Sequence, residues 1–376
     1  MIQHAGLGQQ MQNDRLEFLD NLRGIAALYV LLFHVYRVST PNLAPPPAFA
    51  PLIEFGYSGV WLFFVISAFS LSLTMPRHIA TGMPLVSFAT SRFFRIAPLF
   101  YTVIIYSTLH YCITRWSAPD WGLIAGSVSF LFNLVPKWSR SAVAGGWAVG
   151  VEMIFYAIFP LLYFFAKGIK ARLIIFFVGL VIYYIFANHF SWLVSNPRLW
   201  AQFDAGSIVR FFPSFMLGLL AFEAYVALKV NPRAKLFGSA ALAAGLLLFS
   251  WQVSRSMGWG IFHRVHVDTI AYALILLSAA LCQPRVLASR ILSYYGRISY
   301  SVYLWHIPLI VLSGPVLQRV YASDGPQWLR FAAVSAIVLG LATIIAHVSY
   351  HGIERPSVEY GKRLVKKLSE AQRQTE

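Results

Sequence analysis

The chain has 376 residues, of which 58% are hydrophobic and only 12% are charged, and its mean hydropathy is +0.63. This composition excludes a soluble globular protein and is typical of a polytopic helical membrane protein. The formal net charge is +16. Because the cations are spread along short segments between apolar runs, they favour membrane topology over a nucleic-acid partner.

The apolar runs predict an all-α bundle of about ten transmembrane helices, because each run is close to the roughly 20 residues that a bilayer requires. The runs lie at 24–40, 57–75, 96–114, 147–166, 172–188, 207–228, 236–253, 264–282, 298–314 and 328–350. The segment 121–135 is shorter and has polar flanks, so we expect it to be interfacial or re-entrant. The polar segment up to Asp20 precedes the first run without a small-residue cleavage pattern, and we expect this helix to stay in the mature protein.

The distribution of Lys and Arg predicts the orientation of the bundle. With the N-terminus inside, 20 of the 30 cations fall in inside segments and ten fall outside, which places both termini in the cytoplasm. The predicted division is a cytoplasmic N-terminal segment, 1–20, a transmembrane domain, 21–356, and a basic cytoplasmic tail, 357–376. Cys112 and Cys282 lie in separate apolar runs, so their spacing predicts neither a metal site nor a disulfide framework.

The first apolar run carries two ionisable residues, Arg23 and His34. Eleven residues of α-helix make about three turns and rise about 16 Å, so the two side chains share one stripe and His34 lies near the middle of the bilayer. Ionisable groups at that depth are costly and usually face a bundle interior or a wet cavity. His34 is therefore either a proton-exchanging group or a histidine that hydrogen-bonds a neighbouring helix.

Arg92 and Arg95 lie three residues apart at the predicted cytoplasmic start of the third run. Two guanidinium groups on one helix face can bind a phosphate in bidentate fashion. Topology anchoring and lipid head-group contact explain the same pair equally well.

Glu152 is a lone carboxylate about one turn into the fourth run, and it needs a partner there. Three partners stay possible for this carboxylate: an arginine in an ion pair, the histidine, or a substrate hydroxyl.

The ninth run carries three polar residues at i, i+4, i+7 spacing, Ser299, Tyr303 and His306, which share one helix face. Such a polar stripe indicates either a lined cavity or interhelical hydrogen bonding.

Taken together, these residues resemble the acyltransferase-3 family of integral-membrane acyltransferases over about Leu19 to Pro356. The resemblance is carried by Arg23 and His34 at Arg-x10-His spacing, Phe63 to Ser67, Arg92 and Arg95 with Pro98, Trp147 with Glu152, Phe155 and Tyr156, then Ser299, Tyr300, Tyr303, Leu304 and His306, and finally Ile353 to Pro356.

The resemblance implies transfer of an acyl group, most often acetyl, from cytoplasmic acyl-CoA to a hydroxyl of a surface glycan or lipid-linked saccharide. It implies a multi-pass protein of the bacterial inner membrane, with acyl-CoA as co-substrate and no permanently bound cofactor. His34 becomes the candidate base, with Arg23 and Glu152 beside it, because a sugar hydroxyl needs a base near its proton.

Arg92 and Arg95 become candidate ligands of the coenzyme phosphates, while Ser299, Tyr303 and His306 are expected to line the cavity. Whether His34 takes up a proton or carries the acyl group covalently stays open. A polytopic transporter or flippase is the alternative function, because charged residues in membrane helices can also line a substrate path.

Overall fold

The computed structural model of the chain describes residues 17–39, 43–254, 261–284, 287 and 289–375. Over these residues the regular structure is helical and contains no strand, which confirms the predicted all-α class. The longer helices are α2 (Glu17–Val38), α4 (Gly59–Ile79), α5 (Pro84–Arg115), α7 (Trp147–Phe165), α8 (Gly168–His189), α10 (Ile208–Leu228), α11 (Ala234–Ser254), α12 (Ile261–Cys282), α14 (Ser299–Leu312), α16 (Gln327–Ser349) and α17 (Arg355–Thr375). The shorter ones are α3 (Ala50–Glu54), α6 (Trp121–Val128), α9 (Pro197–Ala205), α13 (Arg290–Arg297) and α15 (Gly314–Tyr321).

Each of the ten predicted apolar runs overlaps one of these helices over most of its length, with ends that differ by one or two residues in several runs, and the ninth run reaches from α14 to the first residue of α15. The end of the first run, at residue 40, lies outside the described residues. Among the described residues, eight helical stretches are long and apolar enough to cross a membrane. A ninth is added if α14 and α15, which meet at a bend of 64°, form one broken span. The apolar helix His266–Cys282 within α12 is shorter. The total of ten spans and the cytoplasmic location of the termini therefore remain predictions.

The segment 121–135 forms the eight-residue helix α6 followed by single 3-10 turns at Phe132–Leu134 and Pro136–Trp138. A helix of that length covers about 12 Å, which is too short to span a bilayer. Asp120 caps α6 by accepting a hydrogen bond from the Leu123 N–H at 3.0 Å. The same hydrogen bond lowers the pKa of Asp120, because it stabilises the charged carboxylate.

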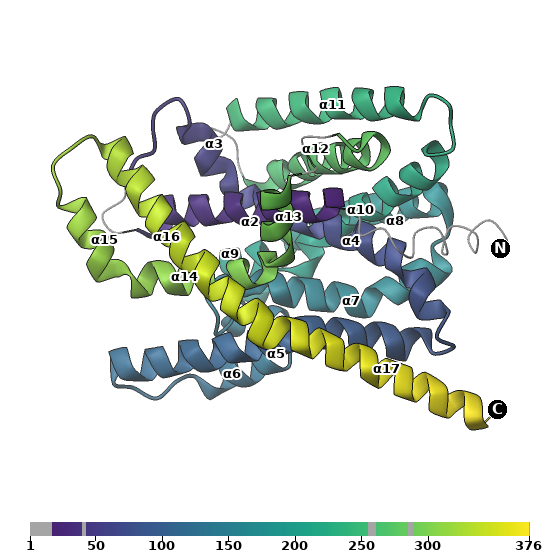
Figure 1. Ribbon diagram of the computed structural model, residues 1–376, viewed down its shortest axis with the longest axis horizontal. Helices are drawn as coiled ribbons and strands as arrows, with labels where there is room; N and C mark the ends of the chain where they lie inside the picture. The colour runs from purple at the N-terminus through teal and green to yellow at the C-terminus, as the bar shows by residue number, and fades with distance from the viewer. Residues whose placement is uncertain (1–16, 40–42, 255–260, 285–286, 288, 376) are drawn as a thin grey trace.

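Helix α2 lies inside the bundle and packs against α4, α13 and α14 (Figure 1). Its crossing with α13 is close because glycines face the partner backbone on both sides: a Cβ at Gly24 would meet the Leu292 carbonyl, and one at Gly296 would meet the Asp20 carbonyl. Helix α11 lies at the edge of the bundle, where much of its apolar surface is exposed. Of the polar residues of α2, Asp20 and Asn21 are buried between the helices, whereas Glu17 and Arg37 near its ends are exposed.

Helix α16 continues through a π-helical turn, Tyr350–Glu354, into α17 (Figure 1). The described part of the predicted basic tail belongs to α17, which is a regular helix and packs along α5. Tyr360 packs edge-on against Phe94 with ring centroids 5.2 Å apart, and the Ser369 hydroxyl donates to the Thr81 carbonyl at 2.8 Å. These contacts hold α17 beside the start of α5.

Candidate active site

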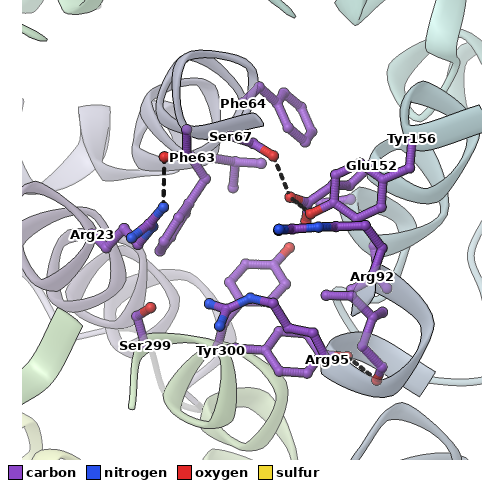
Figure 2. A pocket seen from close by; sticks show the side chains of 16 residues that line it. Arg23, Phe63, Phe64, Ser67, Arg92, Arg95, Glu152, Tyr156, Ser299 and Tyr300 are labelled. Carbon is purple, nitrogen blue, oxygen red and sulfur yellow. Dashed lines mark hydrogen bonds between the residues drawn. The ribbon is translucent and has the colours of Figure 1, made fainter. Parts of the chain in front are cut away.

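A cavity of about 90 Å³ lies between α2, α4, α5, α7 and α14. Its lining combines charged and hydroxyl groups with apolar side chains (Figure 2). The polar members are Arg23, Ser67, Ser70, Arg92, Arg95, Glu152, Tyr156, Ser299, Tyr300 and Tyr303. Five helices from distant parts of the sequence thus contribute to one polar site within an apolar bundle.

Arg23 reaches the cavity from the second turn of α2. Its guanidinium donates to the Ser70 hydroxyl at 2.7 Å and to the Asp20 carboxylate at 3.3 Å. The side chain of Arg23 is 22% exposed, so its charge is only partly solvated. These two contacts fix the guanidinium at the boundary of the cavity.

Arg92 and Arg95 project from α5 toward the cavity (Figure 2). The Arg92 guanidinium carbon lies 5.9 Å from the Tyr156 ring centroid and 5.8 Å from that of Phe88, and its Nε is buried without a hydrogen-bond partner. Within the described part of the chain, neither arginine forms an ion pair. Both guanidinium groups therefore keep donors for an anionic ligand.

Glu152 is the carboxylate of the cavity lining. It accepts hydrogen bonds from the Ser67 hydroxyl at 2.6 Å and from the Tyr156 hydroxyl at 2.5 Å (Figure 2). The structure therefore gives Glu152 two hydroxyl donors from the protein itself, which were not among the partners that the sequence left open. The described residues provide no contact between Glu152 and His34, so these two groups belong to separate hydrogen-bond networks.

A second, larger cavity of about 640 Å³, which we call the vestibule, adjoins the first and shares Arg23, Ser70, Arg92 and Arg95 with its lining. The further cations in the lining of the vestibule are Arg77, Lys229, Arg297 and Lys362, and the carboxylate found among its described residues is Asp20. The first turn of α2 and the first half of α17 both line the vestibule, so they lie on one side of the molecule. The vestibule is strongly cationic, as a binding site for a polyanion requires.

The three residues of the predicted stripe on α14 do not all line the cavity. Ser299 and Tyr303 line the cavity, whereas His306 lies behind Tyr303 and pairs with His34. The ring centroids of Tyr303 and His306 are 5.5 Å apart, and those of His306 and His34 are 4.8 Å apart. On its other side, the Tyr303 ring packs against Phe63, which also lines the cavity, at 6.1 Å. Tyr303 therefore forms a wall between the cavity and the histidine pair.

The structure thus brings together six of the eight candidate residues, namely Arg23, Arg92, Arg95, Glu152, Ser299 and Tyr303, in one cavity, and places His34 and His306 in contact beside it. Sequence reasoning missed the vestibule cations, because Arg77, Lys229 and Arg297 resemble ordinary topology anchors. Ser67 was named only as part of the segment that carries the family resemblance, although its hydroxyl donates a hydrogen bond to Glu152. A hydroxyl beside aromatic residues was the available signal, but its partner is 85 residues away.

A family model described as an acyltransferase domain, that of the acyltransferase-3 family, matches residues 16–347. The O-acetyltransferases OatA of Staphylococcus aureus strains NCTC 8325 / PS 47 and COL are each 25% identical to the chain over 371 residues. The alignments cover 90% of this chain and 56% of each relative, so the chain spans about half the length of the relatives it matches. No solved structure matches the chain.

Proposed function

Because this chain belongs to the acyltransferase-3 family, we propose that it transfers an acyl group, acetyl in the first instance, from acyl-CoA to a hydroxyl of a surface glycan or lipid-linked saccharide. Its similarity to proteins named O-acetyltransferases supports oxygen as the acceptor atom. The observation that carries the proposal is the convergence of Arg23, Arg92 and Arg95 at the junction of the cavity and the cationic vestibule.

The donor binds with its phosphates in the vestibule and its thioester end in the cavity. The vestibule, of about 640 Å³, is the larger space and takes the bulky nucleotide, and the cavity, of about 90 Å³, takes the narrow thioester end. The guanidinium groups of Arg92 and Arg95, which form no ion pair with a described residue, bind phosphate oxygens, and Arg23 lies where the arm enters the cavity.

His34 acts as the general base of the transfer. The acceptor hydroxyl gives its proton to the imidazole of His34, and its oxygen attacks the thioester carbonyl carbon. The C–S bond then breaks, and the coenzyme leaves as a thiolate that takes the proton back from His34 to give the free thiol. The products are the acyl ester and coenzyme A, so the step needs no further reactant.

In this scheme the side chain of Tyr303 or of the neighbouring Phe63 must move. Since the Tyr303 ring separates the cavity from the histidine pair, the thioester reaches His34 only when the Tyr303 or Phe63 ring swings aside. The rest of the lining holds the donor while the acceptor approaches from the side of the histidines. We place the protein in the bacterial inner membrane, with the vestibule facing the cytoplasm and its acyl-CoA pool.

The test uses purified protein in nanodiscs, with acetyl-CoA labelled in the acetyl group and surface glycan as acceptor. Transfer of label, or slow hydrolysis of the thioester, is expected from the wild-type protein. A transporter would show neither reaction, and that result would overturn the proposed function.

The donor site is tested separately through the apparent KM for acetyl-CoA. Arg92→Ala and Arg95→Ala are expected to raise this KM about 10-fold or more while kcat falls less, because contacts to remote phosphates contribute mainly uniform binding. Arg115→Ala, at the exposed opposite end of α5, is the matched control and leaves KM unchanged. An unchanged KM in the Arg92 and Arg95 variants would show that these residues are only anchors.

A further inference from the structure

His34 and His306 form a directly hydrogen-bonded pair of imidazoles, one from α2 and one from α14. The Nε2 atom of His306 lies 3.2 Å from Nδ1 of His34. His306 is almost completely buried, with 1% of its surface exposed, whereas His34 is partly exposed. The two rings are therefore in unequal environments although they are in contact.

Two backbone carbonyls determine which nitrogens carry protons. Nδ1 of His306 lies 2.5 Å from the Tyr303 carbonyl oxygen, and Nδ1 of His34 lies 2.9 Å from the Val30 carbonyl oxygen. A carbonyl oxygen can only accept a hydrogen bond, so both Nδ1 atoms must be protonated. In the neutral pair, Nε2 of His306 is then an acceptor, and the Nδ1–H of His34 is shared between the Val30 carbonyl and His306.

The opposite arrangement is unfavourable on the same grounds. If His306 donated from Nε2, its unprotonated Nδ1 would face the Tyr303 carbonyl, and the unprotonated Nδ1 of His34 would face the Val30 carbonyl. Both contacts would bring two lone pairs together within hydrogen-bonding distance. The contacts of the pair thus select one proton arrangement.

We propose that His306 is a positioning residue, whose Nε2 acceptor acts together with the Val30 carbonyl to hold His34 in the tautomer with a proton on Nδ1 and a free lone pair on Nε2. This inference rests on the proposed function, and it identifies Nε2 of His34 as the nitrogen that acts as the base. Both ring nitrogens of His306 are occupied, whereas Nε2 of His34 makes no hydrogen bond to any described residue. His34 is therefore the member of the pair that can take a proton from an acceptor hydroxyl, and His306 orients it.

Two substitutions separate this role from a packing role. His306→Gln places an amide oxygen near the position of Nε2 and keeps the acceptor, whereas His306→Phe keeps a ring of similar size and removes the acceptor. We expect His306→Phe to lower kcat about 10- to 100-fold, part of the roughly 10²–10⁴-fold that a positioned base contributes, with the donor KM little changed. His306→Gln is expected to restore most of kcat.

The control is His347→Phe, which also removes a hydrogen-bonded histidine but lies on the exposed side of α16, 2.9 Å from the Tyr294 hydroxyl. It should leave kcat and KM unchanged. All variants are compared at equal amounts of monodisperse protein, so that loss of folding is not mistaken for loss of rate.

The direct readout is the ¹⁵N NMR spectrum of protein labelled at histidine, because protonated and unprotonated imidazole nitrogens resonate far apart. The His34 signals, assigned by their loss in His34→Gln, should show a protonated Nδ1 and an unprotonated Nε2. His306→Phe should convert part of His34 to the other tautomer. A packing role would leave the tautomer unchanged.

The outcomes distinguish this inference from the proposed function. If His34→Gln is inactive while His306→Phe keeps its turnover and the His34 tautomer, the positioning role is wrong and the base assignment stands. If His34→Gln is fully active, the base assignment itself is wrong. Loss of rate in His306→Phe with recovery in His306→Gln and a tautomer change supports the inference.

Discussion

At the scale of single residues, three of the lone polar side chains in the apolar runs, Arg23, His34 and Glu152, have a hydrogen-bond partner on another helix. Glu152 illustrates what sequence can and cannot predict here. Its need for a partner follows from the cost of an unpaired carboxylate among apolar residues, and Tyr156 is one helical turn away. Ser67 is on α4, and only the packing of α4 against α7 makes it the second partner.

The hydrogen bonds of Glu152 give a prediction about stability. Glu152→Leu leaves the hydroxyls of Ser67 and Tyr156 without their acceptor, and we expect it to lower the free energy of unfolding by about 1–3 kcal/mol for each unsatisfied buried group. Glu152→Gln keeps an acceptor oxygen and should lose less. Thermal unfolding of the purified variants in one detergent measures the difference, and equal stability of the two variants would contradict the assigned contacts.

At the scale of helices, the crossing of α2 and α13 sets the position of Arg23. The apolar run of α2 was visible in the sequence, but α13 was not, because eight residues with polar character give no clear membrane signal. Gly24 and Gly296 allow the close approach, and the neighbouring Asp20 contacts Arg23. The geometry of the vestibule therefore depends on a helix that sequence periodicity did not identify.

The crossing can be tested with one added methyl group. Gly296→Ala would place its Cβ against the Asp20 backbone, so we expect the helices to separate, at a cost of about 1–3 kcal/mol of stability, and the donor KM to rise. Gly340→Ala on α16 is the control, because a Cβ there meets no atom within 4 Å. Equal melting temperatures for both variants would show that α2 and α13 are not in close backbone contact at Gly296.

At the scale of the whole molecule, sequence predicted the helices well and the site partly. Apolar runs of fixed length are a one-dimensional signal, which explains why all ten coincide with helices. The bend between α14 and α15, the length of α17 and the wall formed by Tyr303 depend on contacts between distant segments. The seven cations that line the vestibule within the described part of the chain nevertheless all belong to the 20 that charge counting assigns to the cytoplasmic side.

That agreement leads to a prediction of topology. A reporter that is active only outside the cytoplasm should be silent when fused after Glu376 and active when inserted near Pro46, because the cation bias orients the chain. The reverse pattern would place the vestibule on the outer side, away from cytoplasmic acyl-CoA. In that case the donor assignment would fail together with the orientation.

The most direct test of acyl transfer at this site is the turnover of His34→Gln in nanodiscs, with acetyl-CoA as donor. Glutamine keeps a polar group at this position but cannot take up a proton near neutral pH. We expect kcat to fall by about 10²–10⁴-fold while the affinity for acetyl-CoA is retained, because His34 lies outside the donor cavity. Turnover close to that of the wild-type protein would contradict the account.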